Sequence, residues 1–186
     1  MPFIKTDFPG LLIFEPVVFE DSRGYFFESY NQKTCLDAGV DIKFVQDNQA
    51  KSSYGVIRGL HYQLNPHAQI KFIRVLAGKI LDVVVDIRTG SPVFGKAYSI
   101  ELSAENHRQL FVPPGFAHGY AVLSETAEVL YKCDTFYHKG SEAGIAYNDA
   151  NLGIDWQIPA GKQVISEKDT HQPSLKDCKN NFVFNS

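Results

Sequence analysis

Arg58-Gly59-Leu60-His61-Tyr62-Gln63 forms a β-prone run, and a second one, Gln69-Ile70-Lys71-Phe72-Ile73-Arg74-Val75, follows shortly after it. A third stretch, Val112-Pro113-Pro114-Gly115-Phe116-Ala117-His118-Gly119-Tyr120, places a proline-glycine turn before another apolar run. Short β-prone runs separated by turn residues are typical of antiparallel sandwiches and barrels. Two histidines and a lysine on such strands can provide a base and a fixed cation. Proton abstraction beside a carbonyl group requires this pair.

The same pattern continues over most of the chain and predicts an all-β fold. Asp21-Ser22-Arg23-Gly24 reads as a turn, and the aromatic run from Tyr25 to Phe27 is expected in the core and at a dimer interface. Residues 31–38 are expected to form a short helix capped by Asn31, and Ser166 is expected to begin another. The expected strands are residues 11–14, 17–19, 25–30, 43–50, 56–63, 70–77, 79–86, 97–102, 109–112, 117–123 and 126–137.

Composition narrows the class of protein. The chain has 186 residues, 44% of them hydrophobic, and a net charge of −3, which predicts one globular domain over residues 1–186 with its core at about 11–140 and a peripheral tail at 141–186. No large basic face is indicated, so nucleic acid is not an expected partner. No apolar run approaches a membrane span, and the first residues have no signal-peptide core. Three widely spaced cysteines favour a reducing, cytoplasmic setting.

Pro113-x-Gly115-x-x-His118 resembles the second motif of the cupins, whose fold is a double-stranded β-helix or jelly-roll barrel. This resemblance implies such a barrel here, with a few short peripheral helices. In metal-binding cupins the first motif supplies two histidines and a glutamate. Here Gln63 replaces one histidine, and Lys71 replaces the glutamate, with six residues between it and Gly78. An ammonium group opposes a divalent cation, so no metal is expected. Lys71 faces either the barrel interior or water.

The combined motifs are more specific than any one of them. They resemble the dTDP-4-dehydrorhamnose 3,5-epimerase family from about Phe14 to Leu175. That family has a jelly-roll fold, needs no metal or cofactor and usually forms homodimers. The matching segments are residues 21–28, 46–48, 52–63, 82–88, 91–95, 114–119, 131–133, 148–149 and 166–169.

The resemblance implies a substrate and four catalytic residues. The substrate would be dTDP-4-dehydro-6-deoxy-D-glucose, in which the C3 and C5 hydrogens both lie next to the C4 ketone; the product would be dTDP-4-dehydro-β-L-rhamnose. His61 matches the general base, and Asp169 matches the carboxylate that orients it. Lys71 matches the group that stabilises the enolate oxygen. Tyr131 matches the acid that returns a proton from the opposite face.

Further residues match supporting and substrate-binding positions. His118 and Asp82 match a second histidine–carboxylate pair beside the ketone. Guanidinium groups suit a diphosphate because they bind it with two parallel hydrogen bonds. Some of these residues would come from the neighbouring subunit, so that the homodimer completes each site. The implied substrate-binding residues are Arg23, Arg58 and Lys168 for the diphosphate, Glu28, Gln46 and Asn48 for thymine and deoxyribose, and Phe19 and Tyr137 for stacking or apolar contact.

Several alternatives remain open at the level of sequence. His61 could be a hydrogen-bonded core histidine, Asp169 could cap a helix together with Ser166, and Tyr131 could be a packed barrel residue. The enzyme could invert only C3 or only C5, or act as a keto-isomerase, because Ala146-Tyr147 stands where the family commonly has a tryptophan and sequence changes near Tyr137 leave the exact sugar contacts open. More distant alternatives are a metal-dependent cupin oxygenase and a non-catalytic sugar-binding module.

Overall fold

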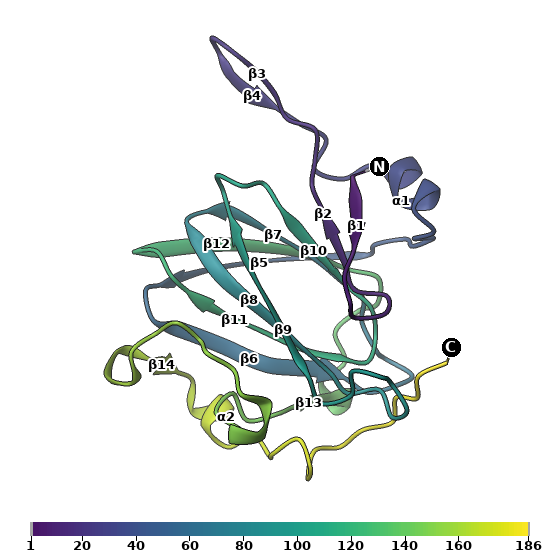
Figure 1. Cartoon of the computed structure of the whole chain (residues 1–186), viewed down its shortest axis with the longest axis vertical. Helices are drawn as coiled ribbons and strands as arrows, with labels where there is room; N and C mark the ends of the chain where they lie inside the picture. The colour runs from purple at the N-terminus through teal and green to yellow at the C-terminus, as the bar shows by residue number, and fades with distance from the viewer. Residues whose placement is uncertain (1, 186) are drawn as a thin grey trace.

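Two six-stranded sheets face one another and enclose the core (Figure 1). This computed structural model describes residues 2–185. The first sheet has the order β1 (Phe3–Lys5), β2 (Leu12–Phe14), β10 (Gln109–Val112), β7 (Lys71–Ala77), β12 (Thr126–Cys133) and β5 (Gln46–Ser53). The second has the order β13 (Glu142–Gly144), β6 (Val56–Gln63), β11 (Phe116–Val122), β8 (Lys79–Asp86) and β9 (Ala97–Ser103), with β14 (Val164–Ile165) parallel to β6. The arrangement is the jelly-roll barrel that the sequence predicts.

The buried strand β8 shows how the barrel is packed. Val84 belongs to the hydrophobic cluster between the sheets, together with Ile73 and Leu110 of the first sheet. Its neighbours Val83 and Val85 point to the opposite face, because successive side chains of a strand alternate. There they pack in a second cluster with side chains from the C-terminal part of the chain, which therefore covers the outer face of the second sheet.

Short helices lie at the periphery. The structure confirms α1 (Gln32–Asp37), whose first turn is capped by the Asn31 side chain accepting from the backbone N–H groups of residues 33 and 34. It also confirms α2 (Glu167–Thr170), which begins after Ser166. Three 3₁₀ turns, Lys139–Ser141, Ala150–Leu152 and Ala160–Lys162, connect the remaining segments. Among residues 2–185, no helix is long and apolar enough to cross a membrane.

Most expected strands are confirmed, and three of them, 56–63, 79–86 and 109–112, have the predicted bounds. The strand predicted at 43–50 begins later, at Gln46, and the strand predicted at 126–137 ends earlier, at Cys133. After Cys133 the Asp134 carboxylate accepts a hydrogen bond from the backbone N–H of Ile70, so a side chain replaces the backbone partner there.

The predicted strand at 17–19 was wrong, and so was the core position expected for Tyr25 and Phe26; the place of the aromatic run at a dimer interface stays a prediction. Val17 and Val18 lie outside any strand, and only Phe19 begins β3 (Phe19–Asp21), which pairs with β4 (Gly24–Phe26). This hairpin extends away from the barrel (Figure 1), and Tyr25 and Phe26 are 61% and 67% exposed. Tyr25 contacts the rings of Phe27 and His107, but at this exposure neither Tyr25 nor Phe26 belongs to the core of one chain.

Candidate active site

His61 and Asp169 meet although they are far apart in the sequence. His61 lies near the end of β6, and its Nε2 is 2.6 Å from Oδ1 of Asp169 in α2. The other carboxylate oxygen accepts a hydrogen bond from the backbone N–H of Gly59 at 3.4 Å. The backbone N–H of Asp169 donates to the Ser166 hydroxyl, so the same residue completes the helix cap and contacts the histidine.

Asp169 is 4% exposed, and burial raises the pKa of its carboxyl group. The hydrogen bond and the charge of His61 lower that pKa, helped by the hydrogen bonds from Gly59 and Ser166, and the net pKa lies below the usual value. The carboxylate is therefore ionised near neutral pH and can orient and stabilise a protonated imidazole.

A very close approach of β6 and β11 brings the two histidines opposite each other. His118 and His61 are register partners, and the pairing becomes irregular between His118 and Tyr120. Gly59 has φ +129°, and a Cβ atom there would lie 2.5 Å from Cα of Gly119. The two strands can come this close only because neither glycine has a side chain.

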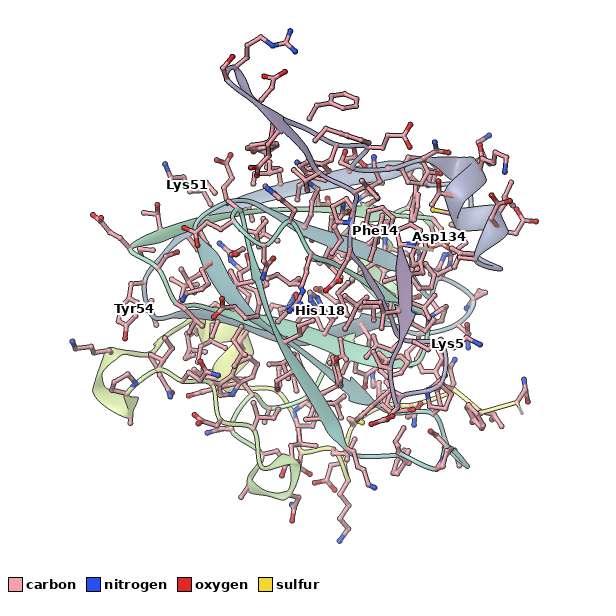
Figure 2. All side chains as sticks on the ribbon, turned by 45° about the horizontal axis from the view of Figure 1, so that its top comes forward. Lys5, Phe14, Lys51, Tyr54, His118 and Asp134 are labelled. Atoms are coloured by element: carbon pink, nitrogen blue, oxygen red, sulfur yellow. The ribbon has the colours of Figure 1, made fainter. Side chains whose placement is uncertain are left out.

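His118 and Asp82 form a second, deeper pair. Nε2 of His118 lies 2.9 and 3.1 Å from the two carboxylate oxygens of Asp82, which is completely buried. Figure 2 shows His118 in the middle of the barrel, whereas Lys51 and Tyr54 lie at its periphery. The contact explains how a buried carboxylate is tolerated, since it accepts hydrogen bonds from a neighbouring ring.

Lys71 and Tyr131 reach the same space from the first sheet. The Nζ atom of Lys71 is 5.8 Å from the centre of the Tyr131 ring, on the neighbouring strand β12. Of the two orientations that the sequence left open for Lys71, the structure has the interior one. Burial lowers the pKa of the Lys71 ammonium and raises the pKa of the Tyr131 phenol to about 12. The phenol is thus protonated at neutral pH and can donate a proton.

These side chains line a cavity of about 500 Å³ and an adjoining recess of about 290 Å³. His61, Lys71 and Tyr131 line both spaces. The cavity is further lined by Ala50, Val56, Ile57, Arg58, His118, Tyr120, Val164, Ile165, Ser166, Lys168 and Asp169. The recess is further lined by Gln46, Asn48, Tyr62, Gln63, Gln69, Tyr137 and Glu142.

Three predicted binding residues lie elsewhere in the single chain. Phe19 and Arg23 belong to the projecting hairpin, where Arg23 forms an exposed ion pair with Asp21. The Glu28 carboxylate accepts a hydrogen bond from the side chain of Asn31. None of the three lines the cavity or the recess. The other predicted site residues do line these spaces, except Asp82. This residue is buried and contacts His118, which lines the cavity.

The sequence did not indicate Glu142. This residue begins β13 and accepts hydrogen bonds from Lys168 and Tyr137, two predicted binding residues on different segments. Its position depends on the pairing of β13 with β6, in which Glu142 lies opposite Gln63. Such long-range pairing leaves no local signal in the sequence.

The donor groups of this site do not form a metal-ligand cluster. Among residues 2–185, no three His, Cys, Asp or Glu side chains gather in a way that could hold a metal ion. Lys71 and Gln63 stand where metal-binding cupins have ligands, and both line the recess.

The sequence and the fold of this chain are similar to those of known epimerases. Residues 5–177 match the family model described as dTDP-4-dehydrorhamnose 3,5-epimerase. An enzyme of that name from Shigella flexneri is 51% identical, over 96% of this chain and 98% of its own. The crystal structure of one from Elizabethkingia anophelis is 53% identical, with a TM-score of 0.90 and coverage of 94% of this chain and 96% of that chain.

A further solved structure carries a ligand. It is the 3,5-epimerase from Legionella pneumophila in complex with dTDP-4-keto-L-rhamnose. It is 45% identical to this chain, with a TM-score of 0.90, and the match covers 94% of this chain and 93% of that chain.

Proposed function

Because this chain belongs to the dTDP-4-dehydrorhamnose 3,5-epimerase family, we propose that it inverts both C3 and C5 of dTDP-4-dehydro-6-deoxy-D-glucose, with His61 as base and Tyr131 as acid. One observation carries the proposal. His61 comes from the second sheet and Tyr131 from the first, yet both line the same cavity. A sugar ring between them would have a base on one face and an acid on the other, as inversion requires.

The reaction at each carbon follows from these groups. Neutral His61 removes the proton from the carbon next to the ketone, and the electron pair of the C–H bond moves to give an enolate at C4. The Lys71 ammonium stabilises the enolate oxygen, and the His118–Asp82 pair supports the same region. Tyr131 then donates its proton to the opposite face of the carbon. Proton exchange with solvent returns His61 to the neutral form and Tyr131 to the phenol.

The nucleotide would be bound at the mouth of the cavity. Arg58 and Lys168 are cations that line it and suit a diphosphate, while Gln46 and Asn48 in the recess suit thymine or deoxyribose. Tyr137 would supply an aromatic surface beside them.

The remaining binding residues would come from a second subunit. Phe19, Arg23 and Glu28 do not reach the cavity of their own chain, and the projecting hairpin exposes apolar rings that suit burial against a partner. We therefore propose a homodimer in which each hairpin completes the neighbouring site. The three cysteines are unpaired, which suits the cytoplasm.

Proton NMR in deuterated water tests the reaction. The dTDP-4-dehydro-6-deoxy-D-glucose substrate is incubated with the protein, and deuterium at both C3 and C5 is the expected result. Trapping the product with a rhamnose-forming reductase reports the inverted sugar. Exchange at one carbon would indicate a single-site epimerase, and exchange at neither would contradict the proposal.

A further inference from the structure

Glu142 occupies a central place at the mouth of the site. It pairs with Gln63 across β13 and β6, and Gly144 pairs with His61 in the same register. Residues two apart on a strand point to the same face, so Glu142 and His61 lie on one side of the sheet. The Glu142 side chain is 25% exposed, and it lines the recess beside His61.

Both oxygens of the Glu142 carboxylate accept hydrogen bonds. Oε1 accepts a hydrogen bond from Nζ of Lys168 at 2.5 Å, and Oε2 accepts one from the Tyr137 hydroxyl at 3.1 Å. Burial raises the pKa of Glu142, but the hydrogen bonds from Lys168 and Tyr137 and the nearby positive charges of Lys168 and His61 bring it below its usual value. The group is therefore a carboxylate at neutral pH.

Lys168 and Tyr137 depend on this carboxylate for their side-chain positions. Lys168 is 54% exposed and Tyr137 is 52% exposed. Among residues 2–185, Glu142 is the only side chain that forms a hydrogen bond with the Lys168 ammonium or with the Tyr137 hydroxyl. The two held groups line different spaces, Lys168 the cavity and Tyr137 the recess, and His61 lines both.

We propose that Glu142 is a positioning residue, which fixes Lys168 and Tyr137 at the mouth before the nucleotide sugar enters. This inference rests on the proposed function and extends it to a residue without a role there. A preorganised site loses less side-chain entropy on binding. A carboxylate near a diphosphate would also repel it, but Lys168 neutralises most of that charge at 2.5 Å. We therefore expect positioning to outweigh repulsion.

Glu142→Gln tests the idea, because it keeps the shape and removes the charge. We expect the KM for the substrate and the dissociation constant of dTDP, measured by calorimetry, to rise by about tenfold, the size of one charge-assisted hydrogen bond. The kcat should change by less than about threefold, because the held groups do not touch the reacting carbons. Glu142→Asp should restore part of the affinity. Glu101→Gln is the matched control, since Glu101 pairs with Lys79 outside both spaces.

A double-mutant cycle shows whether Glu142 changes the KM through Lys168. If Glu142 acts by holding Lys168, then Lys168→Met should add little to the KM of the Glu142→Gln variant. Tighter dTDP binding by Glu142→Gln would mean that repulsion dominates and would overturn the inference, as would unchanged affinity or fully additive effects.

The wild-type protein separates the two proposals. Wild-type turnover with an unaffected Glu142→Gln variant would leave the epimerase function standing and reject only the positioning role. A wild-type protein that binds dTDP without any exchange at C3 or C5 would reject the reaction, and the binding measurements would still decide the role of Glu142. Absence of both turnover and dTDP binding would reject both.

Discussion

Lys71 has an ionisable side chain at a buried position, where loss of hydration disfavours the charged form. Burial lowers the pKa of its ammonium more than the negative charges of Asp82 and Glu142 raise it, and among residues 2–185 no carboxylate lies within ion-pair distance of it. A buried cation without an ion-pair partner destabilises the folded protein, but in the site it can stabilise an enolate oxygen strongly, because little water screens it. Stability and activity should therefore respond in opposite directions to its removal.

Lys71→Met provides the test. We expect kcat to fall by at least about 100-fold, the effect of losing one preorganised stabilising group. The midpoint of thermal unfolding should rise by about 2–4 °C, because a well-packed apolar side chain replaces a desolvated charge. Differential scanning calorimetry and a turnover assay measure the two effects. Lys51→Met, at an exposed position of β5, serves as the control. A loss of both activity and stability would contradict this account of Lys71.

Asp169 should make stability depend on pH. Its pKa is lower in the folded protein than in the unfolded chain, so the carboxylate stabilises the fold above the ordinary pKa, and this contribution is lost as pH falls through the folded value. We expect Asp169→Asn to be less stable than wild type at pH 7, and the difference to shrink below about pH 4. Urea unfolding at several pH values measures it. A difference that stays constant with pH would mean that Asp169 contributes only through packing.

The sequence indicated those site residues that lie within local motifs. His61, Lys71, His118 and Tyr131 lie in or beside the motifs that resemble the epimerase family, and the structure brings all four to one cavity. Their chemical roles remain predictions. Glu142 could not be found in this way, because its importance arises from contacts with two distant segments.

At the level of elements, buried strands were the easiest to predict. Strand β8 is buried along nearly its whole length and was predicted with its observed bounds. Strand β5 is different, because its residues are polar and alternate between partly buried and exposed positions. Its true start is set by pairing with β12, where Gln46 lies opposite Cys133, and an apolar pattern cannot reveal that register.

The contact between β6 and β11 should tolerate no side chain. A Cβ atom on Gly119 would lie 2.6 Å from the carbonyl oxygen of Arg58 and 3.1 Å from Cα of Gly59, which are backbone atoms that cannot rotate away. Gly119→Ala must push the strands apart, and we expect it to lower the free energy of unfolding by about 1–3 kcal/mol. It should also lower kcat, because His61 and His118 face each other across this contact.

Gly161→Ala is the matched control for that substitution. A Cβ atom there meets no other atom within 4 Å, so stability should change by no more than about 0.5 kcal/mol. Chemical denaturation of both variants makes the comparison. Equal stability of Gly119→Ala and wild type would show that the strands can separate at that point without loss.

At the scale of the whole molecule, the packing of a single chain does not explain why the projecting hairpin exposes apolar rings. The aromatic rings of Phe19, Tyr25 and Phe26 are each more than 60% exposed, and Arg23 lies at the turn between β3 and β4. The sequence prediction of a buried aromatic run was wrong for the single chain. Amino-acid type predicts that a ring tends to be buried, but it does not say whether its own chain or another chain covers it. In the proposed homodimer, that surface belongs to the neighbouring subunit.

Mixing two defective variants distinguishes a shared site from a self-contained one. His61→Ala lacks the base, and Arg23→Ala lacks the proposed diphosphate contact, so each homodimer should have little activity. If Arg23 serves the neighbouring subunit, a mixed dimer contains one site with both defects and one site with none. Random pairing at equal amounts gives mixed dimers in about half of the molecules, so activity should return to about a quarter of the wild-type value. Coexpression with two affinity tags allows the mixed dimer to be isolated and assayed. If Arg23 served its own chain, every site in the mixture would keep one defect, and no activity would return.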